Sequence, residues 1–436
     1  MGSTQALGTA PASDRPTVLL TMGDYFGTLA AMRSLGAGGY AMVLADPHEK
    51  TASGVSRYLS SYHKCPPMSD WEAFLPWLLE YGVKNPGHFL YPTCDDAAWL
   101  FAKHSNSLSQ HFMMAPGLCD SIYCMLNKRL LSEAAAACGL ASPVLHQPTC
   151  DEDLQGIIGR VDGDWIAKPV TQIGLRIAKK GTFLGSGAQA VRRYKAFQGQ
   201  LRYAPQIQSA DPQVIWPIVQ RFYRACESSI ISIAGFIAPC GEMIAVSSRK
   251  VLQFPRSFGT GICFESIPLD QQLGEKLARL LRIIGYCGVF EVEFIPDPVT
   301  NRHLIIDANP RFYGQMGFEI ARGLPLPQLA LAMARGDAVG LARGLSEARA
   351  HTNYVNCRYG NRFMLDLVLA GGRLRGSYTS AERQRWRQFP SPVEAPYFDA
   401  LDSPGDPAPL AQVRRSTILK SLRHPRDSFR KYILGV

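Results

Sequence analysis

The sequence lacks the short motifs that most often identify an enzyme class. It contains no Walker A phosphate loop, no HExxH zinc motif and no GxSxG nucleophile turn. P-loop ATPases, metalloproteases and esterases of those types therefore have no support. The 11 cysteines are scattered, without a CxxC pair or a Cys/His cluster at zinc-ligand spacing. We expect buried, reduced thiols rather than disulfides or a zinc site.

Long hydrophobic runs are also missing. No segment approaches the ~20 consecutive apolar residues that a membrane-spanning helix needs. The first residues are small and polar, and no basic stretch is followed by an apolar one, so the sequence predicts no signal peptide. We expect a soluble, cytoplasmic protein with a flexible N-terminus over residues 1–16.

Size and charge set broad limits on the fold and its partners. With 436 residues, of which 46% are hydrophobic, the chain is long enough for two or three packed units and too apolar for wholesale disorder. The formal net charge is +10. Part of the excess falls near the C-terminus, at Arg414, Arg415, Lys420, Arg423, Arg426, Arg430 and Lys431. Such a tail is either simply solvated or binds an anionic surface. No nucleic-acid partner is expected, and the oligomeric state is not indicated.

The first 120 residues alternate short strands and helices. An apolar run at 17–21 is followed by a glycine-bearing turn, a helix that glycines end near residue 36, and a second strand that closes on Asp46. Such βαβ units build parallel sheets. The pattern continues with a helix over 70–81 and a strand over 88–93. We therefore predict an α/β fold with a Rossmann-like first unit.

After residue 120 the pattern mixes helices with hairpins. The sequence predicts, in order, a helix over 121–140, a strand over 164–170, a helix over 188–203, a strand over 217–223, a hairpin over 228–251 and a helix over 273–285. From about residue 345 the chain is punctuated by proline and glycine, and no elements are assigned there.

The most informative segment is GVFEVEFIPDPVTNRHLIIDANPRF, which starts at Gly288. It reads as two apolar strands joined by a turn, yet Glu291 and Glu293 interrupt the first strand, and Asp307 and Asn309 interrupt the second. Because residues two apart on a strand share a face, four oxygen-bearing side chains can meet on one face of the hairpin. Hard oxygen ligands of this kind suit Mg²⁺.

An exposed hairpin whose acids face water is the alternative interpretation. The residues that follow, Pro310 and Arg311, argue against it. A cation placed beside an acid cluster is what a site for phosphate and metal requires.

The hairpin resembles the metal-binding core of ATP-grasp enzymes, whose pattern runs E-x-E-F, a turn, and then [ED]-x-N-x-R. The resemblance implies that Glu293, Asp307 and Asn309 bind Mg²⁺, with Mn²⁺ as an alternative. It also implies that Arg311 contacts the phosphates or an acyl phosphate. Asp307 stands where many members have glutamate, so its shorter side chain is a departure from the common pattern.

Two upstream lysines agree with this resemblance in order and spacing. The segment DWIAKPV resembles the strand of the family that carries a phosphate-binding lysine, which implies that Lys168 contacts the ATP phosphates. The segment MLNKRLLSEAAAACGL implies the same role for Lys128. After the K-P strand, TQIGLRIAKKG has fewer glycines than the loop of many members. Side-chain charge from Lys179 and Lys180 would then contribute to closing the lid on phosphate.

A further segment, VQRFYRACES, resembles the linker that holds the adenine ring. On that resemblance Gln220 binds adenine through its side chain, Arg221, Phe222 and Tyr223 bind it through the backbone, and Glu227 binds the ribose hydroxyls. Ala225 stands where glycine is usual, and a strand of this composition is also typical of plain core.

Within the family, the sequence looks most similar to the carboxylate–amine ligases that include D-aspartate ligase. The shared features are GDYFGTLAAMRSLG near the start, S-R-Y at Ser56 and D-D at Asp95. The segment RKVLQFPRSFGTGICFES resembles the part of that branch beside the acyl-phosphate site. It makes Arg249, Lys250 and Arg256 candidates for holding the carboxylate or the phosphoryl group.

The resemblance implies an ATP-grasp fold divided into five parts. These are a flexible start over 1–16, an N-terminal Rossmann-like domain over 17–119, a lid region over 120–219, an α+β nucleotide and metal domain over 220–344, and a C-terminal extension over 345–436.

The implied activity is ATP-dependent ligation of two small molecules. A carboxylate would be phosphorylated to an acyl phosphate and joined to an amine, with release of ADP and phosphate. Two alternatives stay open: a carboxylase of the same fold that uses bicarbonate, and a degenerate chain that only binds nucleotide. The sequence identifies neither the acid nor the amine.

Overall fold

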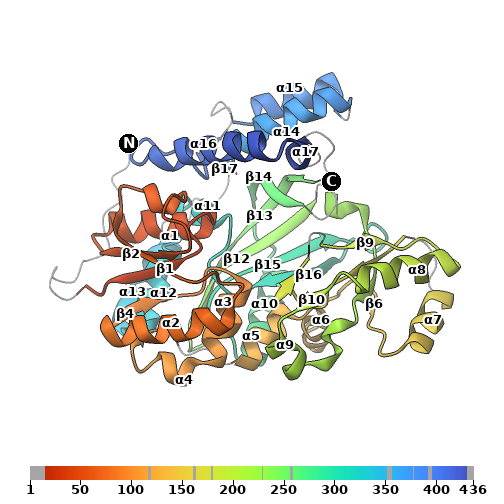
Figure 1. The fold of residues 1–436 in the computed structure, drawn as a ribbon, viewed down its shortest axis with the longest axis horizontal. Coiled ribbons are helices and arrows are strands. Elements are labelled where there is room, and N and C mark those ends of the chain that lie inside the picture. The colour runs from red at the N-terminus through yellow and green to blue at the C-terminus, as the bar shows by residue number, and fades with distance from the viewer. Residues whose placement is uncertain are drawn as a thin grey trace.

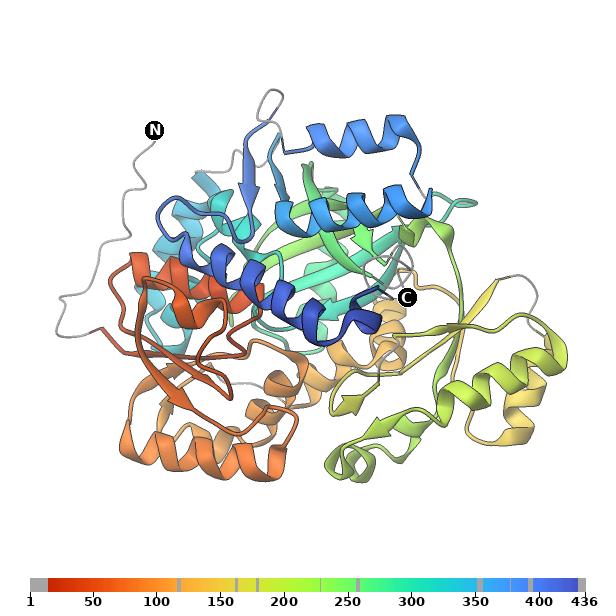
Figure 2. The ribbon, with the colours of Figure 1, turned by 45° about the horizontal axis from the view of Figure 1, so that its top comes forward.

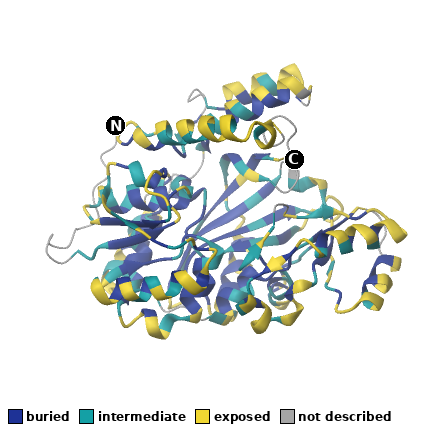
Figure 3. Ribbon diagram, in the orientation of Figure 1, coloured by how far each residue is buried: buried dark blue, intermediate teal, exposed yellow. Residues whose placement is uncertain are grey.

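The computed structural model describes residues 15–115, 119–160, 164–177, 180–227, 229–255, 259–350, 356–376, 378–390 and 395–429. Figure 1 shows an N-terminal α/β unit on one side, a small lid on the other, and a large sheet between them. Helices from the C-terminal part cross the top of that sheet. Figure 3 shows that buried residues continue from the N-terminal unit into the large sheet.

The N-terminal unit is a five-stranded parallel sheet in the order β3-β2-β1-β4-β5. Its strands are β1 (Val18–Thr21), β2 (Met42–Asp46), β3 (Leu59–Lys64), β4 (His88–Leu90) and β5 (Phe112–Met113). Its helices are α1 (Phe26–Ala37), α2 (Trp71–Lys84), α3 (Asp95–Lys103), α4 (Ser105–Leu108) and the short 3₁₀ turn η2 (Ser53–Val55). This confirms the predicted Rossmann-like parallel sheet. Because β1 and β4 are parallel neighbours, the turns after them lie at one edge of the sheet, and Tyr25 and Asp95 come together there.

The lid is built on a four-stranded sheet in the order β6-β11-β7-β9. Its strands are β6 (Leu145–His146), β7 (Trp165–Lys168), β9 (Thr182–Phe183) and β11 (Ile218–Arg221), and a separate pair joins β8 (Leu175–Arg176) to β10 (Arg202–Tyr203). The helices that accompany this sheet are α7 (Asp151–Arg160), α8 (Gly187–Gln198), α9 (Pro205–Ala210) and η3 (Pro212–Ile215). The neighbouring α5 (Cys119–Leu126), α6 (Lys128–Ala137) and η4 (Arg224–Glu227) contact strands of the large sheet instead.

The segment predicted as one helix over 121–140 is two helices. Asn127 separates α5 from α6, and its side-chain oxygen accepts hydrogen bonds from the backbone N–H groups of Arg129 (3.1 Å) and Leu130 (3.2 Å). An asparagine in extended conformation is a strong helix start. The prediction of a single helix was wrong because the local cap outweighs the continuous apolar spacing.

The large sheet has seven strands in the order β16-β15-β12-β13-β14-β17-β18. They are β12 (Ile230–Ile237), β13 (Met243–Phe254), β14 (Thr260–Ile267), β15 (Gly288–Pro296), β16 (His303–Asn309), β17 (Arg358–Gly360) and β18 (Tyr397–Asp399). The helices that follow or join these strands are α10 (Gln271–Ile283), α11 (Met316–Ala321), α12 (Leu326–Ala334) and α13 (Ala338–Ala350). All neighbouring pairs are antiparallel except β17 and β18.

The N-terminal unit packs directly on the large sheet. Tyr91 stacks on Phe312 with ring centroids 4.4 Å apart, and its hydroxyl accepts a hydrogen bond from the backbone N–H of Val289 (2.8 Å). These rings belong to an apolar cluster that both sheets share. The shared core fixes the N-terminal turns relative to the carboxylate hairpin.

The part of the chain after residue 355 joins the same sheet. Its strands β17 and β18 extend the sheet beyond β14, and its helices are α14 (Arg362–Arg375), α15 (Ser380–Gln388), α16 (Ala408–Arg423) and α17 (Pro425–Ser428). Figure 2 shows α16 running across the front of the molecule, over the N-terminal unit and the large sheet. Among the described helices, none is long and apolar enough to cross a membrane.

All eleven cysteines are free thiols, as expected. Their predicted burial holds only in part, because Cys65, Cys138 and Cys263 are buried whereas Cys150 and Cys240 are exposed. Cys150 lies just before α7, and Cys240 lies in the turn that follows Ile237, so neither position requires burial.

Candidate functional site

The carboxylate hairpin forms as the two-residue spacing predicts. In the register of β15 and β16, Glu291 lies opposite Asn309 and Glu293 lies opposite Asp307. All four side chains line one cavity of about 550 Å³. A β-bulge directly after Glu293 shifts the register of the remaining strand. The regular alternation of side chains that places Glu291 and Glu293 in the cavity therefore ends at Glu293.

Each of two carboxylates is paired with a lysine from another element. Lys128, at the start of α6, donates to Asp307 Oδ1 at 3.0 Å. Lys250, on β13, donates to Glu293 Oε1. Burial alone would raise the pKa of Asp307, but Lys128, Lys168 and Lys180 outweigh burial and hold that pKa below its ordinary value. Burial would lower the pKa of Lys250, yet the neighbouring glutamates raise it. The cavity therefore contains carboxylates and lysines whose opposite charges stabilise each other.

Glu291 is held by neutral donors instead. Its carboxylate accepts hydrogen bonds from Ser232 Oγ, from Asn309 Nδ2 (2.5 Å) and from Gln315 Nε2 (2.8 Å). Burial, together with the negative charge of Glu293, raises the pKa of Glu291 to about 7. This network fixes Asn309 against the hairpin floor, where its side-chain oxygen is available to other groups.

That oxygen accepts from Arg311. The Arg311 guanidinium donates to Asn309 Oδ1 (2.6 Å), Asp95 Oδ1 (2.5 Å) and the Tyr25 hydroxyl (2.8 Å). Burial disfavours its charge, but the adjacent Asp95 raises the pKa of Arg311 above its ordinary value. Arg311 is thus a fixed, permanently charged group between the hairpin and the N-terminal turns.

The lid contributes Lys168 and Lys180 to the same cavity. Lys168 ends β7, where it lies opposite Ile218 of β11. Burial, and then repulsion by Lys128, lowers the pKa of Lys168. Four lysines and an arginine thus line the cavity together with the two paired carboxylates. This arrangement suits a polyanion together with a divalent cation.

Other predicted residues lie elsewhere. Arg249 is adjacent to Lys250 on β13, so it points to the opposite face, where it donates to Glu265 at 2.8 Å. Lys250 alone of this pair lines the cavity. Arg256 and Lys179 fall outside the described residues, as does the side chain of Glu227.

The proposed adenine linker is built into the lid sheet. The N–H groups of Arg221 and Phe222 donate to the carbonyls of Val144 (2.9 Å) and Asp164 (2.8 Å). Gln220 is buried, and none of the residues from Gln220 to Tyr223 lines the cavity, whereas the nearby Cys226 does. Their assignment to adenine stays a prediction.

Several cavity residues were not predicted as site residues. Tyr25 and Gln315 bind Arg311 and Glu291 respectively, and Tyr359, Asn361 and Ala400 come from the part of the chain left unassigned. The only sequence signal for Tyr25 and Asp95 was their place in the quoted N-terminal motifs. No pattern in the sequence around Ala400 indicates that this residue lines the cavity.

Comparison with other proteins gives a result for structure only. No known family model matches the sequence, and no curated protein sequence matches it. Solved structures that are similar include the biotin carboxylase of Campylobacter jejuni, with a TM-score of 0.60 at 14% identity over 80% of this chain and 75% of that one. The L-amino acid ligase of Bacillus licheniformis has a TM-score of 0.52 at 14% identity, over 75% of this chain and 77% of that one. The N5-carboxyaminoimidazole ribonucleotide synthetase of Thermus thermophilus has a TM-score of 0.54 at 14% identity, over 73% and 78% of the two chains.

These neighbours are ATP-grasp enzymes. The chain has the ATP-grasp fold. Because the identities are near 14%, the comparison does not select one branch or reaction of ATP-grasp enzymes, and the neighbours include both carboxylases and a ligase.

The ATP-grasp fold implies a bound Mg²⁺, and the donor chemistry can be tested against it. In the described part of the chain no group of three or more His, Cys, Asp or Glu side chains is arranged to hold a metal ion. Mg²⁺ needs less than that, because it takes one or two carboxylates and completes its shell with substrate phosphate and water. Glu293 and Asp307, opposite each other on the hairpin, with Asn309 beside them, fit this requirement.

Proposed function

We propose that this protein is an ATP-dependent ligase that activates a carboxylate as an acyl phosphate and joins it to an amine. The observation that supports this most is the single cavity in which Lys128, Lys168, Lys250 and Arg311 surround the Glu293 and Asp307 carboxylates. Lys128, Lys168 and Lys250 gathered at these two carboxylates suit the phosphates of a nucleoside triphosphate together with its metal.

The chemistry explains why these groups are needed. A carboxylate does not react with an amine at neutral pH, because it is a poor electrophile with a poor leaving group. In the proposed reaction the substrate carboxylate oxygen attacks the γ-phosphorus of ATP, the bond to the β–γ bridging oxygen breaks, and ADP leaves. Lys128 and Lys168 would neutralise the charge that develops on the phosphates. Mg²⁺, or Mn²⁺ in its place, would supply further charge neutralisation when held by Glu293, Asp307 and Asn309.

The second step is attack by the amine on the acyl carbon, with loss of phosphate and a proton. Arg311 and Lys250 are placed to hold the acyl phosphate, since both are cationic and line the cavity. Arg256 stays a candidate for the same role. Asp96 ties the N-terminal unit to the lid side by accepting a hydrogen bond from the N–H of Gly174 (2.6 Å). A lid held closed at this point would protect the acyl phosphate from water.

The contacts of the N-terminal motifs support the D-aspartate ligase-like branch as our finer proposal. Tyr25 of the GDYFG segment and Asp95 of the D-D pair both bind Arg311. The free state of all eleven cysteines is in keeping with the proposed cytoplasmic location.

A carboxylase is the second candidate, because proteins named as carboxylases are among the structural neighbours. It would form carboxyphosphate from bicarbonate in the same cavity. A chain that only binds nucleotide is a third candidate, which the intact set of cations and carboxylates disfavours.

ADP release measured against a panel of acids and amines tests these proposals. For the ligase we expect ADP release that depends on a particular acid, and a hydroxamate when hydroxylamine replaces the amine. ADP release that requires bicarbonate and ignores every amine would establish the carboxylase instead. Nucleotide binding without ADP release under any condition would leave only the binding protein.

A further inference from the structure

The C-terminal segment from β17 to Asp406 closes part of the cavity. Tyr359 on β17, Asn361 just before α14, and Ala400 just after β18 all line it. They meet Phe264 of β14 and Phe26 of α1, which line it as well. Three distant parts of the sequence therefore build one wall.

Apart from Asn361, this wall is apolar. Phe264, Tyr359 and Ala400 belong to a single buried cluster against which Phe26 packs. The rings of Phe264 and Tyr359 lie 6.3 Å apart, and Tyr359 stacks on Phe318 at 5.4 Å, which fixes its orientation. A rigid aromatic wall contributes affinity for apolar groups.

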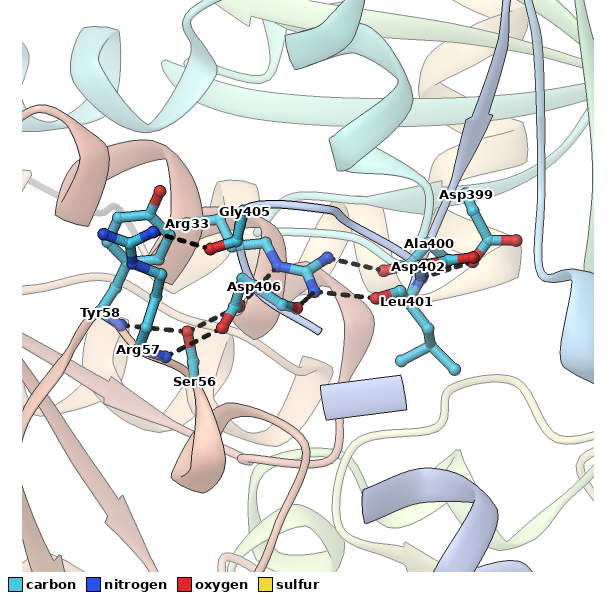
Figure 4. A network of polar contacts seen from close by, with 10 residues as sticks. All are labelled: Arg33, Ser56, Arg57, Tyr58, Asp399, Ala400, Leu401, Asp402, Gly405 and Asp406. Atoms are coloured by element: carbon cyan, nitrogen blue, oxygen red, sulfur yellow. Dashed lines mark hydrogen bonds and ion pairs between the residues drawn. The ribbon is translucent and has the colours of Figure 1, made fainter. Parts of the chain in front are cut away.

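The wall is fastened to the N-terminal unit by Asp406. Figure 4 shows its carboxylate between Arg33 and Ser56. It accepts from Arg33 Nε (2.9 Å), Ser56 Oγ (2.8 Å) and the N–H of Arg57 (2.9 Å), and it is only 1% exposed. Charge-assisted hydrogen bonds to a buried carboxylate are strong and directional.

Arg33 extends the same connection toward the cavity. Its guanidinium also donates to the carbonyls of Ala400 (3.3 Å) and Leu401 (2.9 Å). Ala400 N–H in turn donates to the carbonyl of Gly360 (2.8 Å), next to Tyr359. Arg33 and Asp406 thus set the position of Ala400 relative to α1, whose first residue is Phe26.

We propose that this wall is a substrate subsite that binds an uncharged, apolar group of the acid or amine, and that Asp406 is its positioning residue. The statement that the bound molecule is a reactant rests on the proposed function. Ala400 is the small residue of the wall and leaves room for the bound group. Asp24, an exposed carboxylate that also lines the cavity near Phe26, can pair with an ammonium group of the same molecule.

Binding can be measured without turnover. Glycine, L-alanine, L-leucine and L-phenylalanine are titrated by calorimetry into the full chain in the presence of MgADP. We expect affinity to rise with side-chain size. Ala400→Phe should weaken binding of leucine and phenylalanine by at least tenfold and leave glycine and MgADP binding unchanged. Ala411→Phe, at an exposed position of α16, is the matched control.

Two further variants keep the test decisive if Ala400→Phe does not fold. Tyr359→Ala should flatten the dependence on side-chain size. Asp406→Asn should raise KM for the apolar substrate at least fivefold, with little change in kcat and none in MgADP affinity, and Ser56→Ala should have a smaller effect in the same direction.

The subsite is wrong if none of the four amino acids binds, if affinity does not follow side-chain size, or if the Ala400 and Tyr359 variants bind like the wild type. These outcomes are separate from failure of the proposed function. Size-dependent binding that responds to Ala400, in a protein that never releases ADP, would keep the subsite and refute the ligase.

Discussion

Arg311 and Asp95 form an ion pair, with Nε 2.5 Å from Oδ1, across 216 positions of the sequence. It joins the end of the carboxylate hairpin to the first turn of α3. Both side chains are largely buried, so removal of either one would leave the other as a buried group without this partner. The pair therefore fixes Arg311 in the cavity through a residue of a different unit.

Replacement of Asp95 tests this dependence. Asp95→Asn removes the counter-charge but keeps the size of the side chain, so Arg311 should lose its fixed position. We expect the rate of ADP formation to fall by about 10- to 100-fold, as for loss of a hydrogen bond to a charged group, with little change in ATP affinity. Glu80→Gln, at an exposed position of α2, is the charge-matched control. An unchanged rate in Asp95→Asn would show that Arg311 does not need this partner.

Glu293 and Asp307, the two acids of the proposed metal site, should differ in their effect on stability. Glu293→Gln and Asp307→Asn should both abolish ADP formation and Mn²⁺ binding in the presence of ADP, measured by electron paramagnetic resonance. Lys250 and Glu293 are both nearly buried, whereas the Asp307 side chain is 44% exposed. Loss of Glu293 leaves Lys250 buried beside fewer counter-charges. We therefore expect a clear drop in melting temperature for Glu293→Gln and a smaller one for Asp307→Asn. Full activity of either variant would remove that residue from the mechanism.

Lys168 should bind the phosphates of ATP. Lys168→Ala removes a cation from the cavity, and we expect ATP affinity measured by calorimetry to fall by about 1.5–3 kcal/mol. Lys276→Ala, on the exposed face of α10, is the control. Equal affinity of the Lys168 variant and the wild type would contradict the assignment.

A buried glutamate behind the cavity should make stability depend on pH. Burial raises the pKa of Glu319 to about 8, and the charge of Arg322 only partly opposes this. In the unfolded chain the carboxyl has its ordinary pKa near 4.3. The folded state therefore holds a proton that the unfolded state loses, so this group costs stability progressively as pH rises from about 4 to about 8.

Urea denaturation at pH 5, 6.5 and 8 measures that effect. Glu319→Gln keeps the shape but does not titrate, so its stability relative to the wild type should increase with pH, by up to about 4 kcal/mol between pH 5 and 8. A constant difference across this range would show that Glu319 does not exchange its proton on unfolding.

The C-terminal helix offers a test of anionic-surface binding. Arg415, Lys420 and Arg423 are exposed on α16, close to the exposed Ile418 and Leu422. If α16 binds acidic vesicles, Gln at the three basic positions should weaken binding at least tenfold, since each cation near such a surface contributes about 1 kcal/mol. Added salt should weaken vesicle binding by the wild type. Gln at Arg192, Lys276 and Arg279, three exposed positions on other helices, is the control. Equal vesicle binding by the two triple variants would favour a simply solvated tail.

Local rules were enough to predict the hairpin. The two-residue period of a strand puts Glu291 and Glu293 on one face, and a short turn brings Asp307 and Asn309 opposite them. The parallel N-terminal sheet follows equally from alternating strands and helices. The resemblance to ATP-grasp enzymes predicted Lys128 and Lys168, which share the cavity with the hairpin. These features depend on spacing and residue type within short segments, and a sequence records both.

Tertiary packing decided the rest. The sequence could not say that Lys250 rather than Arg249 faces the cavity, because that depends on which face of β13 is turned toward the cavity. Nor could it pair Asp95 with Arg311 or Asp406 with Arg33, residues 216 and 373 positions apart. The sequence by itself determined which strands carry the four oxygen-bearing side chains of the cavity. Only the folded structure decided which counter-charges hold them and which C-terminal residues complete the wall, because those contacts arise when separate units bury a common surface.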